Sequence, residues 1–147
     1  MAVDRLDPFL IAAKQSGFAF YLTKGSGSVL HIGGTDPRYT DKDIEYHPIL
    51  GLADGGLRLS YWAIGNGKIK VGDKIVASGI STIIDSGTDM IFGPTSIVSN
   101  IYAAIPFGDA TSHVFPCRLP AQQFPKISFS WGDGKEWTID RERWAMQ

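Results

Sequence analysis

The residues best placed to do chemistry are Asp85, Ser86 and Gly87, which directly follow the apolar run Thr82-Ile83-Ile84. The β-branched run is typical of a buried strand, and Ser and Gly after it can turn the chain sharply and offer a hydroxyl and amides to the carboxylate. A strand followed by such a turn would hold the Asp85 carboxylate in a fixed position at the end of the strand. The same residues also make an ordinary Asx or type I turn that ends a strand, so the local pattern alone leaves a catalytic and a structural interpretation open.

Other catalytic chemistries lack their sequence patterns. Ser86 has no Gly-x-Ser-x-Gly elbow around it, which argues against a serine hydrolase. Three scattered His and one Cys give no metal-ligand spacing, and there is no glycine-rich phosphate loop. Asp41, Asp43 and Glu45 alternate as in a calcium loop but lack its central Gly and terminal Glu, so we expect a solvated turn there. We therefore predict no metal and no cofactor.

The composition is that of one globular domain without a strong charge. The chain has 147 residues, of which 44% are hydrophobic and 20% charged. Its 14 basic and 15 acidic residues leave a net charge of -1, so nothing favours binding to nucleic acid or to an anionic membrane. No apolar run is long enough to span a bilayer, and residues 1–5 lack the pattern of a signal peptide. Many Gly, Pro, β-branched and aromatic residues indicate short strands joined by tight turns, so we predict an all-β fold with one or two short helices.

Local patterns predict the elements that position Asp85. Helices are expected over 4–15 and 94–105, and isoleucines recurring every four residues give the second helix an apolar face that should pack on the sheet just behind Asp85. We expect His31 to be a hydrogen-bonded sheet residue rather than a catalyst. Strands are expected over 18–22, 28–32, 44–49, 61–64, 68–71, 75–80, 82–84, 124–131 and 136–139. Turns are expected at 24–27, 65–67 and 72–73, and a two-residue hairpin turn at 133–134.

The motif Asp85-Ser86-Gly87-Thr88 after Ile83-Ile84 resembles the active-site signature of pepsin-like aspartic endopeptidases. The segments 18–22, 27–36 and 76–79 resemble the same family in the same order, and they are most similar to the carboxy-terminal lobe of its fungal secreted members. The resemblance covers most of the chain. It implies a secreted protein with half of a bilobal pepsin-like acid protease fold, so residues 1–147 are expected to form a single partial domain.

The resemblance also implies which residues form the site. Asp85 would be a catalytic carboxylate, because these enzymes activate water between two carboxylates that share one proton. The substrate would be a peptide or protein. The family's lobe usually pairs a Cys at the place of Cys117 with a later one, and that partner would lie beyond Gln147. The residues expected to line half of the substrate cleft are Ser86, Gly87, Thr88, Tyr61, Trp62 and Ile84.

Three departures from the family pattern bear on activity. Only one Asp-Ser/Thr-Gly occurs, so the second catalytic Asp and the flap tyrosine, which belong to the amino-terminal lobe, are lacking. No apolar-apolar-Gly strand follows Trp144 to close the active-site loop, so we expect a truncated lobe whose uncovered surface favours self-association. Asp89 stands where the family mostly has Thr or Ser. It either raises the pKa of Asp85 by like charge or has a surface or helix-capping role, which we favour.

Three functions fit these features. The first is a piece of an aspartic endopeptidase that cuts extended peptides when a second lobe is present and has little or no activity alone. The second is a homodimeric peptidase in which each copy lends one Asp85. The third is a non-catalytic secreted protein that uses the lobe as a binding or immunomodulatory scaffold, since a fold does not fix a function. We favour the first.

Overall fold

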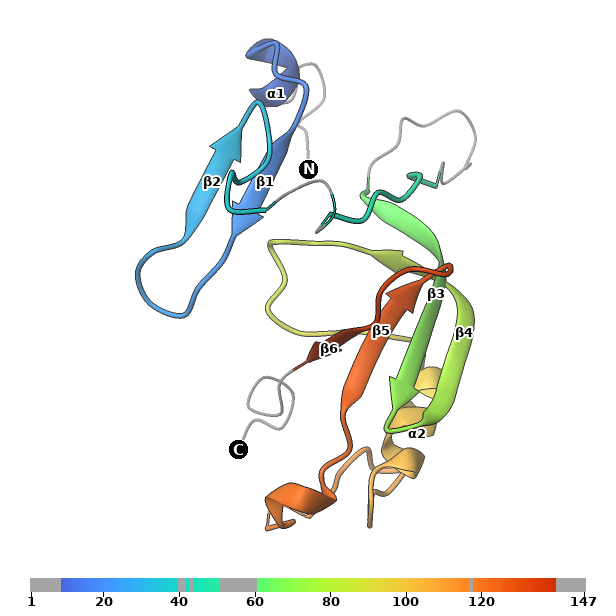
Figure 1. Ribbon diagram of the computed structural model, residues 1–147. Coiled ribbons are helices and arrows are strands. Elements are labelled where there is room, and N and C mark those ends of the chain that lie inside the picture. The colour runs from blue at the N-terminus through green and yellow to red at the C-terminus, as the bar shows by residue number, and fades with distance from the viewer. Residues whose placement is uncertain (1–8, 40–41, 43, 51–60, 117, 140–147) are drawn as a thin grey trace. The chain divides into compact units, whose positions relative to one another are not determined.

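The computed structural model describes residues 9–39, 42, 44–50, 61–116 and 118–139 (Figure 1). The chain divides into two compact units, residues 1–46 and 47–147, which are described one at a time. The first unit holds α1 (Phe9–Ala12), β1 (Phe18–Tyr21) and β2 (Val29–Ile32). The second unit holds β3 (Ala63–Val71), β4 (Lys74–Ile83), α2 (Thr95–Ala104), the 3-10 helix η1 (Ala121–Gln123), β5 (Ile127–Trp131) and β6 (Trp137–Ile139). Across the described residues the fold is mostly β with two short α-helices, which confirms the predicted class.

In the first unit, β1 and β2 form the antiparallel hairpin that the sequence predicts, with Tyr21 paired to Val29 across the connection. Gly25 and Gly27 in that connection have φ angles of 87° and 95°, a left-handed backbone that Gly adopts without strain. The helix expected over 4–15 is shorter at its carboxyl end, because α1 stops at Ala12. Residues 4–8 of that prediction lie outside the described residues.

A buried carboxylate ties the loop after β2 to this hairpin. The Asp36 side chain is only 7% exposed and accepts the Arg38 backbone amide at 3.0 Å as well as bonds from the Arg38 guanidinium. The guanidinium lies 4.1 Å from the centroid of the Tyr21 ring, and His31 Nε2 lies 3.3 Å from Asp36 Oδ2. These contacts fit the structural role expected of His31. The hydrogen bonds from Arg38 hold the pKa of Asp36 well below its ordinary range.

Replacing Asp36 with Asn is expected to loosen the β1–β2 hairpin. The neutral amide loses the charge-assisted bonds from Arg38, so hydrogen exchange of the hairpin amides, relative to their intrinsic rates, should rise about tenfold or more at neutral pH. Because the folded pKa of Asp36 is depressed, its contribution is present above the unfolded pKa of about 3.9 and is lost as pH falls below it. Wild type should therefore approach the variant in strong acid.

The control for this prediction is Asp109→Asn, which removes a turn-capping carboxylate from the second unit. It should leave exchange in β1 and β2 unchanged. Equal exchange in wild type and Asp36→Asn at neutral pH would show that the hairpin does not depend on this cluster.

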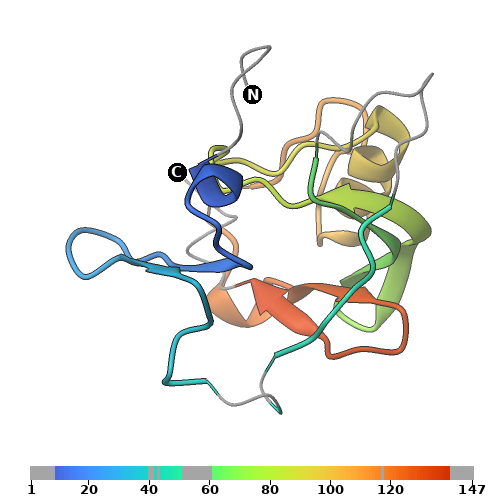
Figure 2. The ribbon, with the colours of Figure 1, turned by 90° about the horizontal axis from the view of Figure 1, so that it is seen from above.

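The second unit is built on an antiparallel sheet in the order β4-β3-β5-β6 (Figure 1). Along residues 68–71 of β3 the side chains alternate as predicted, because Ile69 and Val71 are buried while Lys68 and Lys70 are half-buried. The two views of the ribbon show α2 beside the hairpin of β3 and β4 (Figures 1 and 2). The predicted turn at 72–73 joins these two strands, with Gly72 at a φ of 59°.

The prediction of a turn at 65–67 is wrong. Gly65, Asn66 and Gly67 run through β3, and the pairing with β4 shifts register around Gly67, as in a β-bulge. Asn66 has a φ of 57°, and a Cβ on Gly67 would stand 2.8 Å from Cγ1 of Ile80. Asn66 and Gly67 therefore allow the sheet to bend and β4 to approach β3 closely, and the chain does not reverse its direction there.

Three further strand predictions differ from the structure. The strand expected over 44–49 does not occur among its described residues, where only Ile49 forms an isolated bridge to Ile64. Pro48 explains part of this, because it has no amide to donate to a ladder. The segments 75–80 and 82–84 are not separate strands, since β4 continues through both as far as Ile83.

The hairpin of β5 and β6 is confirmed, but its connection covers residues 132–136 instead of a two-residue turn at 133–134. Glu136 lies within the connection and is held by side-chain bonds. Its two carboxylate oxygens accept Ser128 Oγ at 2.6 Å and Lys70 Nζ at 2.7 Å. The bond from Lys70 lowers the pKa of Glu136.

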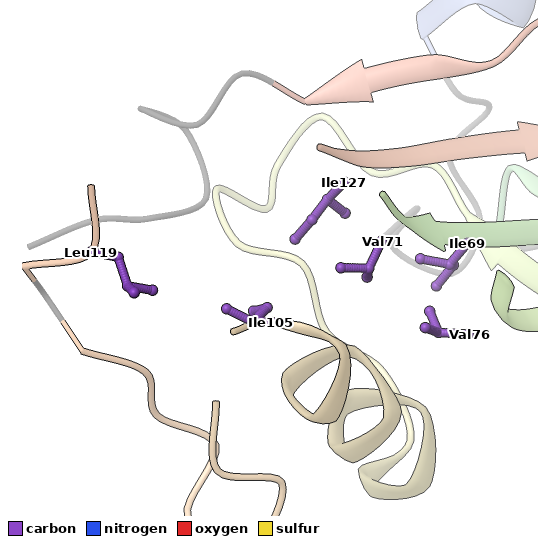
Figure 3. Packing of buried hydrophobic residues seen from close by; sticks show 6 residues of the cluster. All are labelled: Ile69, Val71, Val76, Ile105, Leu119 and Ile127. Carbon is purple, nitrogen blue, oxygen red and sulfur yellow. The ribbon is translucent and has the colours of Figure 1, made fainter. Parts of the chain in front are cut away.

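The core of the second unit lies between the sheet and α2, where the side chains in Figure 3 point toward one another. Ile97 and Ile101 of α2 pack against this core, so the predicted apolar face of the helix is confirmed. The helix lies nearer to the start of β4 than to Asp85, since Asn100 Nδ2 donates to the Val76 carbonyl at 3.3 Å. The expected position just behind Asp85 is therefore wrong. The buried core residues are Ile69, Val71, Val76, Ile105, Leu119 and Ile127.

Candidate active site

Asp85 stands in a tight turn just after β4. The amide of Ile84 donates to the Trp62 carbonyl at 2.9 Å, which carries the pairing of β3 and β4 one step beyond the strand end. Asp85 Oδ1 then accepts the Gly87 amide at 2.9 Å, and Asp85 Oδ2 accepts Thr88 Oγ1 at 2.6 Å. Each carboxylate oxygen therefore receives a hydrogen bond from the residues that follow it. The predicted amide donor is Gly87, but the hydroxyl donor is Thr88 rather than Ser86.

These two bonds favour the ionised form of the carboxylate. The Thr88 hydroxyl and, after it, the Gly87 amide lower the pKa of Asp85, because both stabilise the ionised form. The shift is opposite to the one that a like charge at Asp89 would cause. Asp89 is exposed, which fits its predicted surface role. Its predicted capping role is wrong, because Pro94 is the N-cap of α2 and no side chain bonds to that end.

The strand before Asp85 is not buried as predicted. The side chains of Ile83 and Ile84 are 51% and 50% exposed, and β4 is the outermost strand of its sheet among the described residues. Tyr61 and Trp62 at the same end of β3 are also exposed, at 54% and 57%. The structure thus brings Trp62 and Ile84 together beside the turn of Asp85, as expected for residues around one site.

Sequence reasoning missed a second group of exposed apolar residues near the motif. Met90, Ile91 and Phe92 follow the turn and are 52%, 68% and 75% exposed. The signal was present, since three apolar residues in succession fit neither a strand that alternates nor the helix that starts at Thr95. They add exposed apolar surface to the segment that follows the turn.

The turn itself is not unique to Asp85. Asp109 accepts the Thr111 amide and the Ser112 hydroxyl, both at 2.7 Å, in the same pattern of amide and hydroxyl donors. The Ser112 and Thr111 bonds lower the pKa of Asp109 as well. The local geometry of Asp85 therefore fits both a catalytic carboxylate and a structural Asx turn.

Metal binding finds no support in the part of the chain that is described. Within it, no group of three or more His, Cys, Asp or Glu side chains is arranged to hold an ion. Asp41 and Asp43, two of the three acids in the calcium-like spacing, lie outside the described residues, as does Cys117. Among the described helices, none is long and apolar enough to cross a bilayer.

A mostly β fold with an Asp-Ser-Gly-Thr turn at a strand end fits the pepsin-like class of aspartic proteases. The chain belongs to the eukaryotic aspartyl protease family, whose model matches residues 10–147 and so includes Asp85. No solved structure matches the chain.

Individual relatives agree with this family. Pregnancy-associated glycoprotein 1 of Bos taurus is 33% identical over 126 residues, which are 81% of this chain and 30% of that protein. Cathepsin D of Clupea harengus is 29% identical over 143 residues, which are 91% of this chain and 34% of that protein. Procardosin-A of Cynara cardunculus is 34% identical over 99 residues. The chain spans about a third of the length of the first two relatives.

Proposed function

We propose that this chain is the carboxy-terminal lobe of a secreted aspartic endopeptidase and that Asp85 is one of its two catalytic carboxylates. The observation that carries the proposal is the family match across residues 10–147, which contains a strand-end carboxylate bonded through both oxygens, with exposed apolar side chains before and after it in the chain. A fungal source stays a prediction from the motifs.

The hydrogen bonds at Asp85 suit the role of the ionised partner in a carboxylate dyad. Two carboxylates held close together share one proton, because they cannot both stay charged. The bonds from Thr88 and Gly87 favour the charged form of Asp85, so the proton would reside on the carboxyl of the other lobe. Asp85 would then accept a proton from the attacking water while the protonated partner polarises the scissile carbonyl.

The exposed residues around Asp85 would bind the substrate on either side of the bond that is cut. Tyr61, Trp62 and Ile84 offer apolar surface for side chains of an extended peptide. Ser86, Gly87 and Thr88 would lie closest to the reacting groups, since they form the turn that holds the carboxylate. No cofactor enters this chemistry.

A second candidate is a non-catalytic binding protein built on the same lobe. The turn at Asp109 favours it, because an equivalent carboxylate with equivalent donors stands there without the Asp-Ser-Gly signature. In that case the exposed apolar residues around Asp85 would bind a partner, and the charge of Asp85 would be irrelevant.

Supplying the missing lobe distinguishes the two candidates. The 147-residue chain would be produced alone and as a fusion to the amino-terminal lobe of cathepsin D from Clupea harengus, and both would be assayed for peptide cleavage at acid pH. We expect no measurable cleavage by the chain alone at any concentration and clear cleavage by the fusion. If the fusion folds correctly but cleaves no peptide and binds an aspartic-protease inhibitor only weakly, the result would favour the non-catalytic binding protein. Cleavage by the chain alone that rises steeply with concentration would favour the homodimeric peptidase.

A further inference from the structure

We propose that a hollow on the sheet of the second unit binds a short peptide by both of its ends, with the peptide carboxylate at Lys68 and the peptide ammonium at Asp133. This inference does not rest on the proposed function. The hollow has a volume of about 390 Å³, and its lining residues all belong to the described part of the second unit. The side chains that line it are Lys68, Lys70, Ile75, Ser130, Asp133 and Glu136.

The hollow lies on the face of the sheet that is turned away from the core. Ile69 belongs to the core, so the side chains of Lys68 and Lys70 on either side of it point to the opposite face of β3. Ser130 of β5 is paired with Lys68, and Ile75 of β4 is paired with Lys70. Residues that are directly opposite each other share a face, so these side chains from three strands form one surface.

One wall of the hollow is an ion pair that is already complete. Glu136 Oε2 accepts Lys70 Nζ at 2.7 Å, and Glu136 Oε1 accepts Ser128 Oγ at 2.6 Å. Both oxygens of this carboxylate are therefore bonded, and the charges of Lys70 and Glu136 compensate each other. The charges left to act on a ligand are those of Lys68 and Asp133.

Lys68 and Ser130 together offer a site for a carboxylate. Within the described part of the chain, neither the Lys68 ammonium nor the Ser130 hydroxyl has a hydrogen-bond or ion-pair partner. Lys68 is half-buried and Ser130 is only 8% exposed, so both donors are partly withdrawn from water. A half-buried charge without a counter-charge is unfavourable, and a carboxylate that accepts bonds from both donors would compensate it.

Asp133 offers the opposite charge in the same hollow. It is exposed, and among the described residues its carboxylate has no partner either. Lys68 and Asp133 line one hollow without forming an ion pair with each other. A simple anion would be repelled by Asp133, and a simple cation by Lys68. A molecule with an ammonium at one end and a carboxylate at the other is attracted by both.

The size of the hollow favours a short peptide as this molecule. Its volume lies near the lower end of the range of about 300–1,000 Å³ that is usual for small-ligand sites. A free amino acid carries both charged groups on one Cα, whereas two or three extended residues separate them by about 7–10 Å. Ile75 is 54% exposed and gives apolar surface for a small side chain of the peptide.

Titration of the ¹⁵N-labelled 147-residue chain with trialanine tests the proposal by NMR. At a pH of about 6.5 both ends of the peptide are charged. We expect saturable shifts of the amide signals of Lys68, Ser130 and Asp133. N-acetyl-trialanine lacks the ammonium and trialanine amide lacks the carboxylate, so each should bind about threefold or more weakly than trialanine.

Three results of this titration would overturn the proposal. The first is equal affinity for trialanine and its two blocked forms, which would show that the terminal charges are not recognised. The second is equal affinity for alanine, which would make a single amino acid the ligand. The third is an absence of saturable shifts in the hollow, including shifts confined to Asp85, Gly87 and Thr88, which would place the peptide at the candidate active site instead.

Variants test which charge binds which end. Lys68→Gln should weaken trialanine about threefold or more and cause no further loss with trialanine amide. Asp133→Asn should weaken trialanine similarly and cause no further loss with N-acetyl-trialanine. The controls are Lys74→Gln and Asp73→Asn, which remove the same charges from exposed positions outside the hollow and should leave binding unchanged. Equal effects of the variants and their controls would overturn the proposal.

Discussion

Replacing Asp85 with Asn is expected to lower kcat/KM for peptide cleavage by the lobe-complemented chain about 10²- to 10⁴-fold. The amide cannot accept the proton of the attacking water, and it can accept only one of the two bonds that Gly87 and Thr88 now donate to the carboxylate. The fold should persist, because the carboxylate is exposed and the strand before it is held by β3.

Two control variants distinguish a catalytic effect of Asp85→Asn from the effects of losing a charge or a turn hydrogen bond. Asp89→Asn removes the same charge from an exposed neighbour and should leave cleavage within about twofold of wild type. Asp109→Asn removes a carboxylate from a turn with equivalent hydrogen bonds, so it measures the structural cost of that change. If Asp85→Asn lowers cleavage no more than these two controls, Asp85 has no catalytic role.

The parts of the fold that were correctly predicted depend on local patterns. The alternation around Ile69 and Val71 and the four-residue recurrence in α2 report directly which side chains face a core. The hairpin of β1 and β2 has Gly where a left-handed backbone is needed. Such signals are complete within a few residues, so no knowledge of distant partners is required.

The errors arose where distant partners decide the structure. Gly65, Asn66 and Gly67 are typical turn residues, but β3 pairs with β4 before and after them, so they form a bulge within the strand. Likewise, the run before Asp85 is apolar enough for a buried strand, and only the order of the described strands shows that β4 is the outermost of them. Neither the bulge in β3 nor the outer position of β4 can be predicted from a short segment of sequence.

The sequence correctly predicted a turn that bonds to the Asp85 carboxylate, whereas the catalytic role of Asp85 stays a prediction. Asp85 stands in the predicted turn, with Trp62 and Ile84 beside it. The same hydrogen-bond pattern at Asp109 shows that a carboxylate, an amide and a hydroxyl at this spacing are not specific to catalysis. The family match across residues 10–147 therefore carries more of the functional argument than the turn geometry does.

Stability should be lost most strongly at Gly108, just beyond α2. A Cβ at this position would stand 2.1 Å from the Tyr102 carbonyl oxygen and 3.0 Å from that of Ile105. Both are backbone atoms, so no side-chain rotation relieves the overlap, and the turn after α2 must move. The amide of Gly108 also donates to the Ile105 carbonyl at 2.9 Å, and this bond would be strained. We expect Gly108→Ala to lower the free energy of unfolding by about 3 kcal/mol.

Urea unfolding followed by Trp fluorescence measures this loss, because Trp62, Trp131 and Trp137 all belong to the second unit. The matched control is Gly93→Ala at the other end of α2, where a Cβ would be 3.8 Å from Val98 Cγ2, an ordinary contact. Its effect should stay within about 0.5 kcal/mol. Equal effects of the two substitutions would show that the turn can rearrange freely. Because α2 packs on the start of β4 and not at Asp85, Gly108→Ala should reduce stability while kcat/KM of the folded fusion stays close to that of wild type.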